Sequence, residues 1–192
     1  MNIALRKPMS LAEFLAWEER QELKHEFDGF GPVAMSGGTA GHTQIQGNLA
    51  AALITRLRGQ PCRYYGNDLK FLTAEGTLRY PDGMVLCGPV ERHAKLVETP
   101  VVVFEVLSPS TTQTDRIVKA REYQATPSVQ RYVMLEQDGA AAVVYARAGL
   151  VWTHEILTAE SVLALPEIGV ELPLAELYEG IAFETDEGQQ TA

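Results

Sequence analysis

The feature that most constrains this chain is the seven-residue run Val101–Leu107, which is apolar at every position except Glu105. A run that is apolar on both faces predicts a buried central β-strand, and Ser108-Pro109 ends it. A buried carboxylate is costly unless it is paired, hydrogen-bonded or bound to a metal. Two interpretations follow: Glu105 meets an arginine or a backbone amide, or it lies at the carboxyl end of a sheet and holds a cation.

Asp82 is the second acidic residue at a predicted strand. It follows Pro81, whose ring fixes φ, and precedes the apolar segment Met84–Cys87. A turn-forming aspartate is the alternative interpretation. If Asp82 and Glu105 lie on neighbouring strands, a divalent cation would offset their repulsion. Mg²⁺ binds through one or two carboxylates and keeps several waters, one of which can act as a nucleophile.

The rest of the chain predicts an α/β fold with a central mixed β-sheet flanked by helices. The capping box Ser10–Glu13 predicts a helix over 10–22, and apolar spacing predicts a second over 42–57. Threonine N-caps predict a third, ending near 125. Short strands are expected within 25–35 and at 62–65, 69–72, 84–87, 131–135 and 141–145, with a last short helix at 174–178. We expect one domain over 1–183 and a mobile, polar acidic tail over 184–192.

Composition excludes several classes of protein. The 192 residues suit one domain, and no apolar run approaches the ~20 residues of a membrane span. The N-terminus lacks the long apolar segment of a signal peptide. Cys62 and Cys87 do not make the disulfide framework of a small secreted protein. We therefore expect a cytoplasmic protein in a reducing setting, without a membrane partner.

The formal charge of −9 is unevenly distributed. Nine of the 25 acidic residues lie from Glu155 onward, whereas none of the 16 basic residues follows Arg147. Such acidity disfavours a broad phosphate-binding face, but it allows a local one in the first three quarters of the chain.

Several separated motifs occur in an order that resembles a known family. They are Lys24–Gly29, Ala34–Thr39 with His42, Asp68–Lys70, Tyr80–Asp82, Val103–Thr111 and Asp115-Arg116 with Lys119 and Tyr123. Over about residues 8–148 the chain resembles the small bacterial "putative restriction endonuclease" proteins, abundant in cyanobacteria, of the PD-(D/E)XK nuclease superfamily. The resemblance implies a restriction-endonuclease-like core that cuts nucleic acid with Mg²⁺, or with Mn²⁺ in its place.

The resemblance also assigns site residues. Asp82 matches the aspartate of "PD", Glu105 the acidic residue of "(D/E)XK", and Glu26 the acidic residue supplied near the first helix. These three would bind the metal and, with a lysine, form the catalytic set. The motif lysine is missing, because Leu107 stands in its place.

Lys119 is the first candidate for that lysine. It shares one helical face with Asp115 and Tyr123. A solvated lysine paired with Asp115 is the alternative interpretation, and Lys70 is the second candidate for the missing base. His42, at the start of a long helix, either contacts phosphate or metal or is a structural helix residue.

Together these features predict a Mg²⁺-dependent endonuclease that hydrolyses phosphodiester bonds in DNA. A homodimer would suit double-strand cutting. Leu107 and the lack of an obvious basic surface motivate an alternative, a catalytically inactive domain of the same fold that binds nucleic acid or protein. A third possibility is an unrelated α/β domain in which Glu105 is merely ion-paired.

Overall fold

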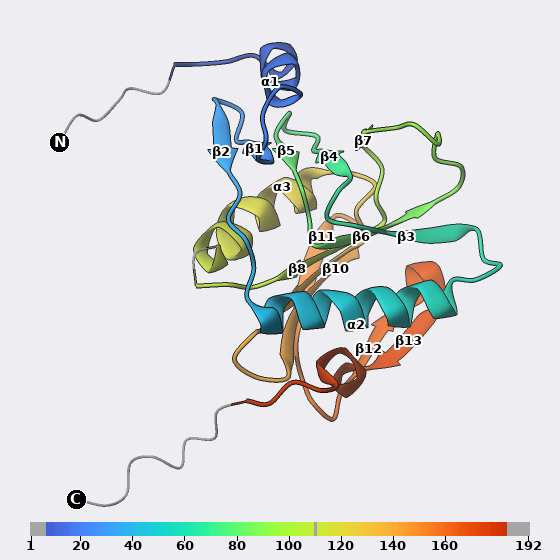
Figure 1. Ribbon diagram of the computed structural model, residues 1–192. Coiled ribbons are helices and arrows are strands. Elements are labelled where there is room, and N and C mark those ends of the chain that lie inside the picture. The colour runs from blue at the N-terminus through green and yellow to red at the C-terminus, as the bar shows by residue number, and fades with distance from the viewer. Residues whose placement is uncertain (1–6, 110, 184–192) are drawn as a thin grey trace, which may run out of the picture.

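The computed structural model describes residues 7–109 and 111–183, so the predicted tail 184–192 lies outside the described residues (Figure 1). A six-stranded mixed sheet forms its centre, in the order β11-β10-β9-β8-β6-β3. Strands β8 and β9 pair in parallel, and the other neighbours pair antiparallel. Its strands are β3 (Cys62–Gly66), β6 (Gly83–Cys87), β8 (Val102–Val106), β9 (Arg131–Leu135), β10 (Ala141–Ala148) and β11 (Val151–Thr158).

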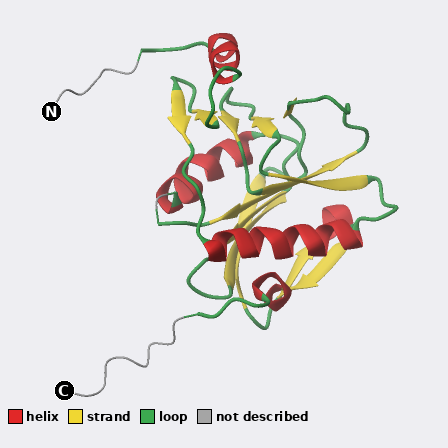
Figure 2. Cartoon of the chain, viewed as in Figure 1, coloured by secondary structure: helices red, strands yellow, loops and turns green. Residues whose placement is uncertain are grey.

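Helices cover both faces of this sheet, which confirms the predicted central mixed sheet flanked by helices (Figure 2). One face packs on α2 (Ala40–Arg56), with Ile45, Leu49 and Leu53 fully buried. The same core includes the hairpin β12 (Val162–Leu165)–β13 (Val170–Pro173) with η2 (Pro166–Ile168), and η3 (Leu174–Tyr178). The other face packs on a π-helical segment, η1 (Thr114–Lys119), and on α3 (Ala120–Ala125), which continues it.

A second, smaller sheet lies beside α3, in the order β2-β1-β5-β4-β7 (Figure 1). Its strands are β1 (His25–Phe27), β2 (Pro32–Ala34), β4 (Lys70–Leu72), β5 (Leu78–Arg79) and β7 (Leu96–Val97). Helix α1 (Leu11–Glu18) packs Phe14 on Phe27 of this sheet and ends earlier than the predicted residue 22. The sheet matters for function because β1 and β5 carry charged side chains toward α3.

Cys62 and Cys87 form a disulfide, which corrects the expectation that two cysteines without a framework stay reduced. The reason is strand register, because β3 and β6 pair antiparallel with Cys62 directly opposite Cys87. Among the described residues no helix combines the length and the hydropathy needed to cross a membrane. The cytoplasmic location stays a prediction.

The disulfide gives a first stability prediction. Cys62 and Cys87 link β3 to β6. The free energy of unfolding of the Cys87→Ser variant should therefore be about 2–4 kcal/mol lower than that of the wild type in a non-reducing buffer. Urea titration followed by circular dichroism measures the difference. In dithiothreitol the wild type and the variant should differ little, and an equal gap in both buffers would mean that the bond itself contributes nothing.

Candidate active site

The side chain of Glu105 in β8 points to the α3 side of the central sheet. Its neighbours Phe104 and Val106 belong to the core around α2, so the alternation of a strand turns Glu105 the other way. There Lys119 Nζ lies 3.0 Å from Glu105 Oε1, and the Tyr123 hydroxyl donates to the same oxygen at 2.9 Å. Glu105 is only 3% exposed. The acid in the apolar run is therefore buried and hydrogen-bonded from one helical face.

Lys119 is the centre of these contacts. Besides Glu105, its Nζ lies 3.1 Å from Asp115 Oδ1 and 3.2 Å from Glu26 Oε1. Burial alone would lower the pKa of Lys119, but the three carboxylates outweigh burial and raise that pKa well above its ordinary value. The lysine is thus a buried ammonium held among three acids, and not the solvated helix lysine of the alternative interpretation.

Glu26 reaches the same place from β1, after the end of α1 and within the segment 25–35 in which short strands are expected. Its Oε2 accepts from Arg79 Nη1 at 3.0 Å, and its Oε1 accepts from the backbone N–H of Tyr80 at 3.2 Å. Burial raises the pKa of Glu26, but Lys119 and Arg79 outweigh it and hold that pKa below the ordinary value. Arg79 in turn makes two bonds to Glu122, of 2.7 and 2.6 Å.

These groups form one buried charge cluster, made of Glu26, Arg79, Glu105, Asp115, Lys119 and Glu122. Four carboxylates face two cations, so the cluster has an excess of negative charge when all are ionised. Burial, with the nearby carboxylates of Asp115, Asp82 and Glu26 added to it, outweighs Lys119 and raises the pKa of Glu105 well above its ordinary value. The cluster therefore favours an additional proton or cation.

Asp82 directly precedes β6 and lies next to the backbone of β8. Its Oδ2 accepts from the N–H of Val106 at 2.6 Å, and its Oδ1 accepts from Gln46 Nε2 at 2.6 Å. His42 Nε2 is 3.2 Å from the same Oδ1. The β6–β8 register pairs Gly83 with Phe104, and one further step sets Asp82 opposite Glu105. The two acids thus lie on neighbouring strands at one end of the central sheet.

Only some of the predicted residues are in contact. Lys119 contacts both Glu105 and Glu26, whereas Asp82 is hydrogen-bonded to the backbone of β8 at Val106. Lys70 lies elsewhere, with its Nζ 2.6 Å from Glu18 Oε2. Within residues 7–109 and 111–183, no three His, Cys, Asp or Glu side chains converge closely enough to hold a metal ion. The three-carboxylate ligand set stays a prediction that this arrangement does not assemble.

Three residues of the site carried no strong signal in the sequence. Gln46 is one helical turn after His42, so helix spacing places both on the face that meets Asp82. Arg79 and Glu122 read as ordinary charges on a short strand and a helix. Only the packing of β5 against α3 shows that they pair, and no periodicity in either segment reveals it.

Comparisons with known proteins agree with this architecture. The model of a family described as "Uma2: Putative restriction endonuclease" matches residues 11–175. The uncharacterized protein slr1290 of Synechocystis sp. (strain ATCC 27184 / PCC 6803 / Kazusa) is 33% identical over 182 residues, which cover 91% of this chain and 94% of the relative. The uncharacterized protein sll1609 of the same strain is 28% identical over 141 residues, covering 71% and 80%.

A solved structure gives the same result at the level of the fold. The crystal structure of a putative nuclease belonging to DUF820, from Anabaena variabilis ATCC 29413, matches with a TM-score of 0.73 and 19% identity. The match covers 89% of this chain and 98% of that one. The resemblance seen in the sequence is thereby confirmed: the chain belongs to the Uma2 family of putative restriction endonucleases.

Proposed function

We propose that this protein is a Mg²⁺-dependent endonuclease with a restriction-endonuclease-like core that hydrolyses phosphodiester bonds in DNA. The single observation that carries the proposal is the placement of Asp82 and Glu105 on neighbouring strands at one end of the central sheet, with the buried ammonium of Lys119 bonded to Glu105. A purely structural ion pair would not need an excess of acid around it. The family and the fold support the same class of reaction.

The donor set fits a hard divalent cation. Asp82 and Glu105 supply carboxylate oxygens, and Mg²⁺ needs only one or two of these beside its waters. Lys119 Nζ and the Tyr123 hydroxyl both contact Oε1 of Glu105. Asp115 Oδ1 is buried, and although Lys119 is 3.1 Å away, the described residues give it no hydrogen bond of good geometry. Negative charge at this place therefore exceeds what the protein itself neutralises.

Each residue then has a role that follows from its contacts. Asp82 and Glu105 would hold the ion, which supplies charge neutralisation and an activated water when bound. Lys119 would stabilise negative charge that develops on the phosphate, as the motif lysine absent at Leu107 would do. Glu26 would orient Lys119 from the second sheet, at 3.2 Å. Lys70 does not fit this role, because Glu18 holds it.

Calorimetric titration with Mg²⁺ tests the site without any substrate. We expect one binding site in the wild type and none in Asp82→Ala. Because burial raises the pKa of Glu105 and a bound cation favours the ionised carboxylate, we expect binding to be coupled to proton release and to tighten as the pH rises. Repeating the titration in buffers of different ionisation enthalpy counts the released protons.

A second candidate function is the inactive interaction module. Leu107 in place of lysine favours it, together with the contacts that already occupy Lys119 on three sides. No binding of Mg²⁺ or Mn²⁺ at millimolar concentration would favour this function over the nuclease. The homodimer also remains a proposal, which sedimentation velocity decides.

A further inference from the structure

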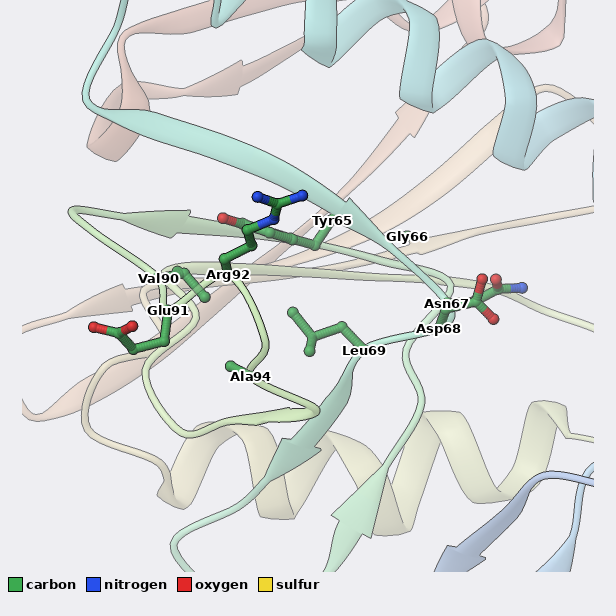
Figure 3. A pocket seen from close by; sticks show the side chains of 9 residues that line it. All are labelled: Tyr65, Gly66, Asn67, Asp68, Leu69, Val90, Glu91, Arg92 and Ala94. Carbon is green, nitrogen blue, oxygen red and sulfur yellow. The ribbon is translucent and has the colours of Figure 1, made fainter. Parts of the chain in front are cut away.

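A cavity of about 440 Å³ opens at the end of β3 (Figure 3). It lies between the end of β3 and the segment 90–94, with Asn67 and Asp68 at one end and Glu91 at the other (Figure 3). Its apolar wall includes Tyr65 and Leu69. The volume lies within the range of small-molecule sites, about 300–1,000 Å³.

The cavity is close to the acids because it shares their strands. Gly66 of β3 pairs with Gly83 of β6, the residue directly after Asp82. Tyr65 is partly buried and packs against the core on the α3 side of the sheet, the side to which Glu105 points. One strand spacing and one or two residues separate Tyr65 from Asp82, a distance of roughly 10 Å.

The turn that closes the cavity toward Asp82 is held in place from the second sheet. Lys24 donates to the carbonyl of Asn67 at 3.3 Å and pairs with the carboxylate of Asp68. Leu69 N–H closes the turn on the carbonyl of Gly66 at 3.5 Å. The cavity therefore has one fixed polar end and one aromatic wall.

The charges of the chain limit how it can hold a nucleic acid. At least nine of the 16 lysines and arginines are paired with acids: Lys24, Arg56, Lys70, Arg79, Lys95, Arg116, Lys119, Arg121 and Arg131. With a net charge of −9, phosphate contacts supply little affinity. Contacts to bases must then supply part of the affinity, and stacking of one base on an aromatic ring contributes about 1–3 kcal/mol.

Arg92 supplies a positive charge in the cavity lining that can contact a phosphate. It lines the cavity, is exposed, and makes no ion pair with any residue that the structure describes. An aromatic ring beside an unpaired arginine is the combination that binds a single strand, with the base on the ring and a phosphate on the guanidinium.

We propose that this cavity binds one unpaired nucleobase of a DNA strand, stacked on Tyr65, with a flanking phosphate on Arg92. The inference rests on the proposed nuclease function and names its substrate as single-stranded or locally unpaired DNA. The Asn67 amide stands at the polar end, where it can meet the edge of the base. A duplex keeps its bases paired and stacked, so it cannot fill the cavity.

Equilibrium binding in EDTA tests the cavity without requiring cleavage. The probe is a fluorescein-labelled 15-mer DNA strand, compared with its duplex by anisotropy at one salt concentration. We expect the single strand to bind the wild type at least about 10-fold more tightly than the duplex. Tyr65→Ala should weaken single-strand binding by about 5- to 100-fold, whereas Tyr65→Phe keeps the ring and the affinity.

Two further variants distinguish loss of the cavity from loss of folded protein. Ala94→Trp fills the cavity and should weaken binding like Tyr65→Ala, even if the latter loses stability. Arg92→Ala should lower the slope of log K against log salt by about 0.7. Arg58→Ala is the matched control, because Arg58 is also an exposed arginine, follows the end of α2 and is not among the residues that line the cavity.

The outcomes distinguish the two proposals. Equal binding of strand and duplex, or wild-type affinity in both Tyr65→Ala and Ala94→Trp, overturns the cavity proposal and leaves the nuclease untouched. Single-strand binding that depends on Tyr65, in a protein that cleaves no DNA with Mg²⁺ or Mn²⁺, supports the cavity and overturns the nuclease.

Discussion

Glu105→Gln and Asp82→Asn should each reduce metal-dependent cleavage of DNA by about 100- to 1,000-fold or more. Each change removes a negative charge at the end of the sheet where Asp82 and Glu105 lie on neighbouring strands, and so weakens both metal binding and the neutralisation of charge in the transition state. The measurement is the rate of cleavage of a mixed single-stranded and duplex DNA substrate with about 10 mM Mg²⁺.

The stability of Glu105→Gln sharpens this test. The pKa of Glu105 is raised in the folded state, so ionising Glu105 costs folded stability as the pH rises above the ordinary value of 4.5. The neutral glutamine avoids that cost while its oxygen still accepts from Lys119 and Tyr123. We therefore expect Glu105→Gln to be at least as stable as the wild type at pH 8, although it is inactive.

A matched control keeps the comparison specific. Glu171→Gln removes one carboxylate from an exposed position of β13, and it should change neither the cleavage rate nor the stability measurably. Cleavage at the wild-type rate by Glu105→Gln and Asp82→Asn would end the nuclease proposal. A matching loss in Glu171→Gln would point to net charge instead of to the site.

Lys119→Met should lower the free energy of unfolding by about 3–5 kcal/mol at pH 8. Methionine matches the lysine in length, but it leaves Glu105, Glu26 and Asp115 facing one another without the ammonium. Guanidinium titration monitored by tryptophan fluorescence measures the loss. Cleavage should fall as well, because the ammonium of Lys119 is bonded directly to Glu105.

The loss should depend on pH in a defined direction. The raised pKa of Lys119 means that its contribution is complete below the ordinary lysine pKa of 10.5 and is lost only in more alkaline solution. In Lys119→Met only protonation can relieve the repulsion among the carboxylates, so the difference in free energy of unfolding between wild type and variant should shrink from pH 8 to pH 5.

Lys95→Met is the control variant. It breaks the exposed pair with Glu19 and should cost less than about 1 kcal/mol at both pH values. Similar losses in the two variants would mean that burial of the cluster has no energetic consequence.

The central acids could be predicted because each breaks a strong local pattern. Glu105 interrupts an apolar strand, and Asp82 follows a proline at a strand entrance. Lys119 was identifiable because Asp115, Lys119 and Tyr123 recur every four residues. Glu26 was harder to place, because its strand has only three residues and its partners, Arg79 and Lys119, come from distant elements.

Some parts of the fold could not be predicted because they leave no pattern in the local sequence. Strand β11 is an edge strand with Val151 and Ile156 exposed, so it lacks the alternation that marks a half-buried strand. Strands β5 and β7 have two residues each, too few for any periodicity. The disulfide between Cys62 and Cys87 depends on the register of β3 and β6, which only the folded sheet reveals.

The wide spread of the charge cluster along the chain has a consequence for biosynthesis. Glu26 emerges from the ribosome long before Lys119, and β8 carries Glu105 into a sheet that is completed only when β9 arrives to pair with it. Such non-local contacts form late in folding. A nascent chain therefore displays Glu26 and Glu105 before Lys119 can hold them together, and the cluster is complete only after β9 has been made and has paired with β8.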